Sequence, residues 1–375
     1  MKKIVRSVFI GLLFINLSFA SAQLKPGFDA AEYAGLLTLR FDSLAIGYQV
    51  HVTPSLSYKL LYQSPEVGLF NKCDFWLRND NVVIINIRGT INKTESWLEN
   101  FYSAMIPATG QLQLNDSTLF NYKLAERTDA YIHVGWTIGI AHLAPIIVSE
   151  LNKLYKSGYK EVIIFGHSQG GAIAYLTRSY LQYLPATQLP KDIIYKTYCS
   201  AAPKPGNLYY AYDFDFITRD GWALRVVNTA DWVPETPLTV QTLSDMNQAN
   251  PVVDYKNSIQ SMSWLVRMYV NSAYKKMDRT ADKGVKYYQK YLGNMVFKQV
   301  KKTLPQLKEP AYAPSNYYLP AGTQVVLMAD SAYYQNFKFT GKNVFVNHMY
   351  EPYLYLLNKY YPANQFVGQK KAIDN

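Results

Sequence analysis

The apolar positions of this chain form short continuous runs that alternate with longer stretches of helically spaced apolar residues. A short continuous run predicts a strand buried on both faces, and helical spacing predicts a helix with one buried side. The predicted strands are 73–77, 81–88, 162–165, 196–199, 222–228 and 324–328. The predicted helices are 28–44, 131–155, 169 to about 183, and 349–360. This alternation predicts an α/β fold with a mostly parallel, doubly wound sheet.

Two stretches depart from the alternation. Residues from 89 to about 126 are polar and predict a loop-like region. Residues from about 240 to 320 predict a helical insertion, with helices at 258–276 and 283–302 that are rich in Lys, Tyr and Met. This insertion is compatible with a cap, with a surface that seeks an interface, or with a helical layer packed on the sheet. Since no repeat or low-complexity linker interrupts the chain, we expect one domain over residues 23–375.

The N-terminus has the pattern of a secretory signal peptide. Lys2, Lys3 and Arg6 precede an apolar stretch at 8–19 that is too short to span a bilayer comfortably. An A-x-A cleavage pattern ends at Ala22, and no cysteine follows it to carry a lipid anchor. We therefore expect removal of residues 1–22 and export to the periplasm or the medium. No later apolar run is expected to span a membrane.

The formal net charge is +11, and loss of the signal peptide lowers it to about +8. A basic exported protein could favour anionic surfaces, but a generally basic surface is the simpler interpretation, and the charge looks diffuse along the sequence. Nucleic-acid binding therefore has little support. Cys73 and Cys199 either pair after export or stay as two separate buried thiols, and the strand after Cys73 is expected at a sheet edge. Their spacing fits no metal site, so neither a metal nor another cofactor is expected.

Residues 161–174 read EVIIFGHSQGGAIA and carry the strongest chemical signal. An apolar strand runs into Gly166-His167-Ser168-Gln169-Gly170, and a helix of small residues follows. This G-x-S-x-G pattern between strand and helix is typical of the nucleophile elbow of α/β-hydrolases. Gly166 and Gly170 would relieve the collisions of so sharp a turn. The turn would present Ser168 at the carboxyl end of its strand, next to a helix N-terminus.

A serine nucleophile needs a base within reach and an acid that orients the base. In α/β-hydrolases the chain order is serine, acid, histidine, and His348 is the only histidine after Ser168. Asp231 is the preferred acid, because it directly follows a predicted core strand. The acids Asp254, Asp278 and Asp282 lie in the helical insertion, and the histidines left aside are His51, His133, His142 and His167.

The oxyanion hole requires two N–H donors that point at the developing charge. One donor is expected from Gln169, which follows the nucleophile. The other is expected from Thr90, at the end of the strand VVIINIRG, which can offer its N–H and its hydroxyl.

The order of seven segments resembles the class 3 lipase family of fungal-lipase-like α/β-hydrolases. The segments span residues 82–354 and read IIN-IRGT, WLENF, HVGW, FGHSQGG, AAPKPGN, NTADWVPETP and NHMYEPYL. The resemblance implies a nucleophile at Ser168, an acid at Asp231, a base at His348, and oxyanion donors at Thr90 and Gln169. It also implies a lid at about 92–113, which contains Trp97, Phe101, Met105 and Ile106.

Two departures from the family pattern bear on substrate and lid. The stretch from Asp231 to His348 is long for the family, and Glu99 and Asn100 stand where an aspartate is frequent. The sequence thus predicts a secreted serine ester hydrolase for acyl lipids such as triacylglycerol, partial glycerides or phospholipid, with transient contact to a lipid interface. The alternatives are a non-lipid esterase for feruloyl or acetyl esters, and a non-catalytic binding protein on the same fold.

Overall fold

The computed structural model describes residues 24–44, 48–51, 56–362 and 367–370. The predicted signal peptide and its cleavage site lie outside these residues. Within them, the helices are α1 (Ala30–Leu44), α2 (Thr94–Phe101), α3 (Val134–Lys156), α4 (Gln169–Tyr183), α5 (Leu208–Ile217), α6 (Tyr255–Ser258), α7 (Trp264–Tyr288), α8 (Val296–Thr303), α9 (Ser331–Asn336) and α10 (Tyr350–Tyr360). Short 3-10 turns are η1 (Val233–Glu235) and η2 (Leu243–Asp245), and η3 (Gln289–Met295) is a π-helical segment.

A seven-stranded sheet forms the centre of the described residues, in the order β12-β11-β10-β9-β4-β3-β2. The strands from β4 to β12 are parallel, and β2, β3 and β4 pair antiparallel. The sheet strands are β2 (Tyr58–Gln63), β3 (Cys73–Arg78), β4 (Val83–Ile87), β9 (Glu161–His167), β10 (Ile194–Ser200), β11 (Ala223–Asn228) and β12 (Thr323–Leu327). The predicted mostly parallel α/β sheet is confirmed.

Three short antiparallel pairs flank the sheet: β1 with β13, β5 with β8, and β6 with β7. Their bounds are β1 (Tyr48–His51), β13 (Val367–Lys370), β5 (Met105–Pro107), β8 (Tyr131–His133), β6 (Thr109–Gln113) and β7 (Leu119–Lys123). The prediction of a loop-like region from 89 to about 126 is therefore wrong. Alternating burial in β7 shows why, since its inward residues Phe120 and Tyr122 join the core while its polar residues face outward.

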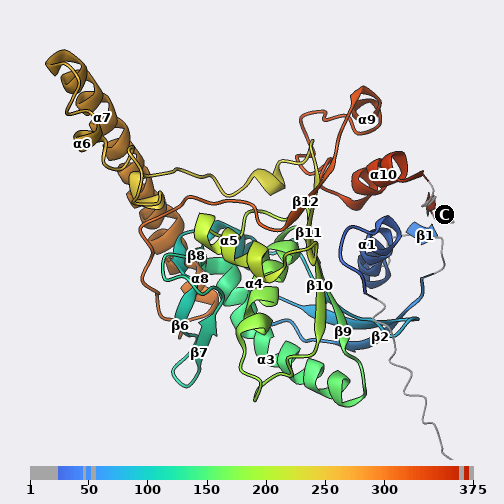
Figure 1. Ribbon diagram of the computed structural model, residues 1–375. Coiled ribbons are helices and arrows are strands. Elements are labelled where there is room, and N and C mark those ends of the chain that lie inside the picture. The colour runs from blue at the N-terminus through green and yellow to red at the C-terminus, as the bar shows by residue number, and fades with distance from the viewer. Residues whose placement is uncertain (1–23, 45–47, 52–55, 363–366, 371–375) are drawn as a thin grey trace, which may run out of the picture.

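Helices cover both faces of the sheet (Figure 1). On one face, α3, α4 and α5 contribute to a large apolar cluster with the inward residues of β4 and β9. On the other face, α1 and α10 pack over Ile84, Ile163 and Phe165. The consecutive apolar residues of β4 and β9 are buried on both sides for this reason.

Helix α3 is long and apolar enough to cross a membrane, contrary to the expectation that no run after the N-terminus reaches that length. However, 67% of its apolar stretch is buried inside the fold. It packs against α4 and α2 and supplies Trp136, Ile140 and Leu143 to the core. Its hydropathy is thus accounted for by internal packing.

Cys73 and Cys199 are both free and buried, so the pairing alternative is wrong. Cys73 begins β3, which lies between β2 and β4 rather than at an edge. Cys199 lies in the central strand β10. Burial raises the pKa of the Cys73 thiol to about 12 and also raises the pKa of the Cys199 thiol, so both stay protonated and unreactive near neutral pH.

The predicted insertion contains one continuous helical unit instead of two separate helices. Segments α7, η3 and α8 follow one another without a break from Trp264 to Thr303. The residues at the predicted interruption, 277–282, hold neither Gly nor Pro and stay helical. The outer part of α7 projects away from the body of the molecule, so the interpretation as a layer packed on the sheet is wrong for that part (Figure 1).

Candidate active site

Ser168 lies in a strained turn between β9 and α4. Its φ is +62°, a left-handed value that residues other than Gly rarely adopt. A Cβ on Gly166 would lie 2.1 Å from the carbonyl oxygen of Gly170, and a Cβ on Gly170 would lie 2.1 Å from that of Ile87. Both glycines are therefore required by close backbone approach. The N–H of Ser168 donates to the carbonyl of Ser200 on β10, which ties the turn to the sheet (2.9 Å).

His348 and Asp231 form a buried pair at the same end of the sheet. Asp231 follows β11, and His348 immediately precedes Met349, the N-cap of α10. The Nδ1 of His348 lies 2.7 Å from Oδ2 of Asp231. Since an ionised carboxylate only accepts hydrogen bonds, this geometry places the proton on Nδ1 and leaves Nε2 as the unprotonated nitrogen of the neutral ring.

Further donors hold the Asp231 carboxylate in place. The hydroxyl of Tyr353, on α10, donates to the same Oδ2 (2.8 Å). The N–H of Val233 donates to Oδ1 (3.0 Å). The side chain of Asp231 is fully buried, so these donors replace the water that the carboxylate loses.

His167 supports the loop that carries His348. Its Nε2 lies 2.8 Å from the carbonyl oxygen of His348, and its Nδ1 lies 2.9 Å from the hydroxyl of Ser200. A neutral ring with the proton on Nε2 satisfies both contacts, with Ser200 as the second donor. The hydroxyl of Tyr33, on α1, lies 2.6 Å from the hydroxyl of Ser200. A series of hydrogen bonds from Tyr33 on α1 through Ser200 on β10 and His167 on β9 therefore fixes the position of His348 relative to the sheet.

Thr90 and Gln169 lie side by side next to Ser168. The hydroxyl of Thr90 donates to Oε1 of Gln169 (2.9 Å) and accepts from Nδ2 of Asn100 (2.8 Å). Gln169 is the first residue of α4, so helix geometry gives its N–H no partner four residues back. The Thr90 hydroxyl must turn away from Gln169 before it can donate to a bound oxyanion.

Glu99 is buried directly behind this pair. It accepts from Nδ2 of Asn71 (2.7 Å), and its exposed fraction is 0%. Burial raises the pKa of the Glu99 carboxyl to about 8, although hydrogen bonding to Asn71 and Gln169 acts in the opposite direction. Of the two residues at the family's usual aspartate position, Asn100 contacts Thr90 and Glu99 faces inward.

A cavity of about 680 Å³ opens at Ser168. Ser168, His348, Thr90 and Gln169 all line it. Its other walls are mainly aromatic and aliphatic, and include Trp97, Phe101, Trp136, Trp232, Leu238, Tyr288, Leu292, Phe345 and Met349. The volume is in the range of small-molecule sites, and the lining favours an apolar ligand.

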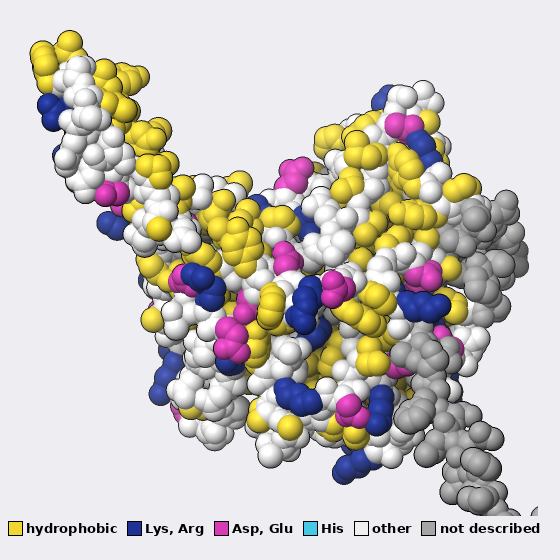
Figure 2. Space-filling model, viewed as in Figure 1, with side chains coloured by type: hydrophobic (Ala, Val, Ile, Leu, Met, Phe, Trp, Pro, Cys, Tyr) yellow, Lys and Arg dark blue, Asp and Glu magenta, His cyan; other side chains and the backbone are white. Residues whose placement is uncertain are grey.

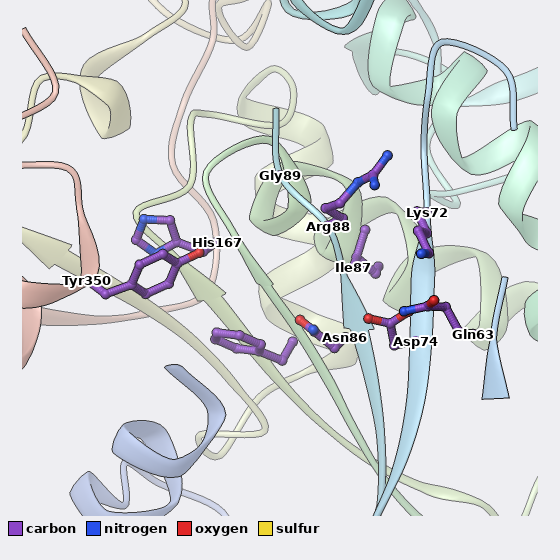
Figure 3. A pocket seen from close by; sticks show the side chains of 10 residues that line it. Gln63, Lys72, Asp74, Asn86, Ile87, Arg88, Gly89, His167 and Tyr350 are labelled. Atoms are coloured by element: carbon purple, nitrogen blue, oxygen red, sulfur yellow. The ribbon is translucent and has the colours of Figure 1, made fainter. Parts of the chain in front are cut away.

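A second, smaller cavity of about 140 Å³ lies on the α1 and α10 side of the sheet. Figure 3 shows His167 and Tyr350 on one side of it and Gln63, Lys72 and Asp74 on the other. His167 and Tyr350 also line the larger cavity, so these two side chains form the wall between them. Burial raises the pKa of the Asp74 carboxyl. The small volume and partly polar lining make this second cavity a poor fit for a long acyl chain.

The segment expected as a lid has two distinct parts. Trp97 and Phe101, on α2, line the cavity, and Phe101 is half exposed. Met105 and Ile106 are buried in β5, which pairs with β8. A lid that extends to 113 is therefore wrong, because most residues after 101 belong to β5 and β6. The part of the expected segment that faces the cavity is α2.

The remaining histidines and acids lie away from the cavity. His133 caps α3, stacks on Trp136 at 3.5 Å, and has its pKa lowered to about 3 by burial. His142 is half-buried on α3, and the side chain of His51 lies outside the described residues. Asp254 caps α6, while Asp278 and Asp282 lie on α7. Among the described residues, no group of His, Cys, Asp and Glu is arranged to hold a metal ion.

Sequence reasoning missed the residues that support the site. Tyr353, Ser200, Tyr33 and Asn100 all contact a predicted site residue or its immediate support. Tyrosine and serine are common in this chain, so their identity carries no positional signal. Asn100 did have a positional signal, because it stands at the family's usual aspartate position.

Comparison with known proteins gives a family for part of the chain. Residues 84–241 match the family model described as Lipase (class 3). This segment contains Thr90, Ser168, Gln169 and Asp231, while His348 lies beyond it. No curated protein sequence matches the chain significantly.

Several solved structures are similar in part. A mutant form of MDLA from Penicillium cyclopium is 20% identical with a TM-score of 0.35, over 48% of this chain and 58% of that one. A triacylglycerol lipase from Penicillium expansum is 17% identical with a TM-score of 0.38, over 56% and 73%. The Rhizomucor miehei triacylglyceride lipase is 18% identical with a TM-score of 0.36, over 48% and 61%. This chain thus spans little more than half the length of the first of these structures.

The strand order, the strained serine turn and the parallel sheet define an α/β-hydrolase fold. Within it, residues 84–241 match the class 3 lipase family model, in agreement with the resemblance noted in the sequence.

Proposed function

We propose that this protein is a serine hydrolase that cleaves carboxylic esters of acyl lipids. The observation that carries the proposal is the position of Ser168 and His348 on the wall of one large, mainly apolar cavity. The class 3 lipase match over residues 84–241 supports the same activity class.

In the proposed reaction, Nε2 of His348 takes the hydroxyl proton as Ser168 Oγ bonds to the ester carbonyl carbon. The carbonyl π electrons move onto its oxygen, and the N–H groups of Thr90 and Gln169 stabilise that charge. The intermediate then breaks its carbon–oxygen ester bond. The leaving alcohol takes the proton from His348, and the acyl group stays on Ser168.

Water completes the cycle by the same route. His348 removes a proton from water as the hydroxide bonds to the acyl carbon, and it returns that proton to Ser168 as the acid leaves. Asp231 keeps the proton of the neutral ring on Nδ1 and stabilises the imidazolium.

The lining of the cavity favours a long aliphatic acyl chain over a short or polar acyl group. Trp97, Phe101 and Leu292 supply apolar wall, and burial of each methylene is worth about 0.8 kcal/mol. A feruloyl or acetyl esterase would gain less from so much apolar wall. Those esters are the second candidate substrates, because aromatic walls also accept a flat aryl group.

Hydrolysis of p-nitrophenyl butyrate and p-nitrophenyl palmitate by wild type and Ser168→Ala tests the proposal. We expect serine-dependent turnover that is higher for the long chain, and a loss of several orders of magnitude in Ser168→Ala. Turnover of the butyrate but not of the palmitate would select the second candidate. A folded wild type that matches Ser168→Ala on every ester would leave a binding protein on this fold.

We also propose that the protein is exported and that residues 1–22 are removed. The basic start, the short apolar stretch and the A-x-A pattern support this. N-terminal sequencing of the protein recovered from culture medium or periplasm should begin at Gln23. Recovery of an uncleaved chain in the cytoplasm would contradict export.

A further inference from the structure

The most exposed part of the described residues is a helical arm. We define the arm as Trp264 to Thr303, which comprises α7, η3 and α8. Its base is anchored, since Val285, Phe297 and Val300 are buried and the N–H of Ala104 donates to the carbonyl of Leu292. Its outer part, residues 264–284, contains no buried residue.

The arm carries a net charge equal to that of residues 24–375 as a whole. It holds ten Lys and Arg and two Asp, a net charge of +8. Residues 24–375 hold 35 Lys and Arg and 27 Asp and Glu, because three of the 38 basic residues precede them, and their net charge is also +8. Everything in 24–375 outside the arm therefore sums to zero. The interpretation of the charge as diffuse is wrong.

The arm is also strongly amphipathic. Helical spacing places Val266, Val270, Ala273, Met277 and Ala281 on one side. The same spacing places four basic residues of α7 on the opposite side: Lys275, Arg279, Lys283 and Lys286. Such a helix normally buries its apolar side, but here that side is only partly covered: Val270, Ala273 and Ala281 are half-buried, while Val266 and Met277 are exposed.

The tip of the arm exposes several large apolar side chains. Leu265, Met268 and Tyr269 have exposed fractions of 54%, 58% and 74%, and Met262 and Trp264 are exposed beside them. Figure 2 shows hydrophobic side chains over the tip and along one edge of this projection. So many large apolar side chains in one exposed region mark an interaction surface.

We propose that the arm binds the surface of anionic phospholipid membranes. The apolar tip and side would enter the boundary between headgroups and acyl chains, and the opposite basic side would contact anionic headgroups. A helix with a large charge, a Trp and Leu tip and a continuous apolar side fits such a boundary. A nucleic acid would match the charge but leave the apolar side in water.

The position of the arm connects this surface to the cavity. Tyr288 and Leu292, at its base, line the cavity that contains Ser168. The rim of the cavity is also apolar, with Leu238 80% exposed and Phe101 55% exposed. A membrane held by the arm would therefore face the cavity mouth. The binding itself needs no ester chemistry, so it is tested independently of the proposed hydrolysis.

Vesicle co-sedimentation tests the proposal, with Ser168→Ala as the parent so that the lipid stays intact. The probes are vesicles of 30% phosphatidylglycerol in phosphatidylcholine and vesicles of phosphatidylcholine alone. We expect tighter binding to the anionic vesicles, and loss of that preference in high salt.

Two arm variants separate charge from insertion. Lys275→Gln with Lys276→Gln and Lys283→Gln should weaken binding to anionic vesicles roughly 100-fold, at about fivefold per charge. Leu265→Ser with Met268→Ser and Tyr269→Ser should weaken binding to both kinds of vesicle at least about tenfold. Both variants should keep the wild-type melting temperature and, with Ser168 restored, the wild-type turnover of a soluble short-chain ester.

Matched controls change the same chemistry elsewhere. Lys25→Gln with Lys59→Gln and Lys156→Gln removes three exposed lysines from the body. Tyr212→Ser with Phe216→Ser and Leu119→Ser removes three exposed apolar side chains there. Each control should bind anionic vesicles within about twofold of the parent, because neither touches the arm.

Three outcomes would overturn the proposal. The first is vesicle binding by the arm variants that equals that of the parent. The second is a loss in the body controls as large as in the arm variants. The third is a parent protein that sediments as a dimer, together with a tip variant that sediments as a monomer but binds vesicles as the parent does. This result would assign the surface to a second copy of the chain.

Discussion

The end of the sheet that holds Ser168 and the arm both contain charged and aromatic residues, but the first region buries them and the second exposes them. At this end of the sheet, the fully buried Asp231 accepts hydrogen bonds from His348, Tyr353 and Val233. On the outer arm, charged and apolar side chains alike lie in solvent, and Tyr255 stacking on Tyr274 joins α6 to it. Packing and hydrogen bonds fix the positions of the site side chains, whereas the proposed membrane binding of the arm depends on its length, charge and apolar area.

This contrast predicts where substitutions matter. A change at this end of the sheet disturbs groups that several elements hold in place, so it alters catalysis or stability. A change on the outer arm removes few contacts within the protein, so both should stay nearly constant.

The largest effect is expected from Asp231→Asn. The amide nitrogen would face His348 and Tyr353, because Val233 donates to the other oxygen. His348 would then carry its proton on Nε2 and could not accept one from Ser168. We expect kcat on a soluble ester to fall on the order of 10³- to 10⁴-fold.

The matched control is Asp254→Asn, which changes an acid that the sequence places in the helical insertion. It should leave kcat unchanged. Equal losses in both variants would remove Asp231 from the proposed site.

A core and an arm substitution should differ in the free energy of unfolding. Ile164 is fully buried in β9, and Ile164→Ala should cost about 2–5 kcal/mol through lost burial and a cavity. Met277 is 59% exposed on α7, and Met277→Ala should change stability by less than about 0.5 kcal/mol. Denaturant titration of both variants measures the difference, and a similar cost at Met277 would mean that the arm packs against the body in solution.

Removal of the Thr90 hydroxyl tests the contact beside Ser168. Thr90→Val keeps the shape and the N–H but loses the bonds to Gln169 and Asn100. We expect kcat to fall roughly 10- to 100-fold, with KM for a soluble ester nearly constant, because the hydroxyl, once turned from Gln169, would donate to the oxyanion only in the transition state. A change in KM alone would limit Thr90 to substrate binding.

The smallest effect concerns the pH dependence of stability. Glu99 has its pKa raised from 4.5 to about 8, so the folded state binds a proton that the unfolded state releases above pH 4.5. Its contribution is therefore complete in acid and is lost as pH rises through about 8. Glu99→Gln should flatten the decline in melting temperature between pH 5 and 9.

Glu126→Gln is the control for that measurement, because Glu126 is exposed and pairs with Lys123. It should keep the wild-type pH profile. A wild-type profile in Glu99→Gln would show that Glu99 is ionised in the folded protein.

Local patterns predicted much of the fold. The continuous apolar runs of β4 and β9 and the helical spacing of α3 and α10 are visible in a window of a few residues. Strand β2 was missed because its residues are only partly buried, as suits an edge strand. Helix α5 was missed because its tyrosines and phenylalanines occur on all sides and show no clear period.

The sequence by itself determined the glycine-flanked turn around Ser168, since the G-x-S-x-G pattern is contained in five consecutive residues. It also determined the order of Ser168, Asp231 and His348 and the number of charges. Only the tertiary structure decided that Asp231 meets His348 117 positions later, that Tyr353 and Ser200 support them, and that Cys73 and Cys199 stay apart. It alone showed that the segment with the net charge forms an exposed arm. Such features depend on the distance between segments in space, which a local pattern does not contain.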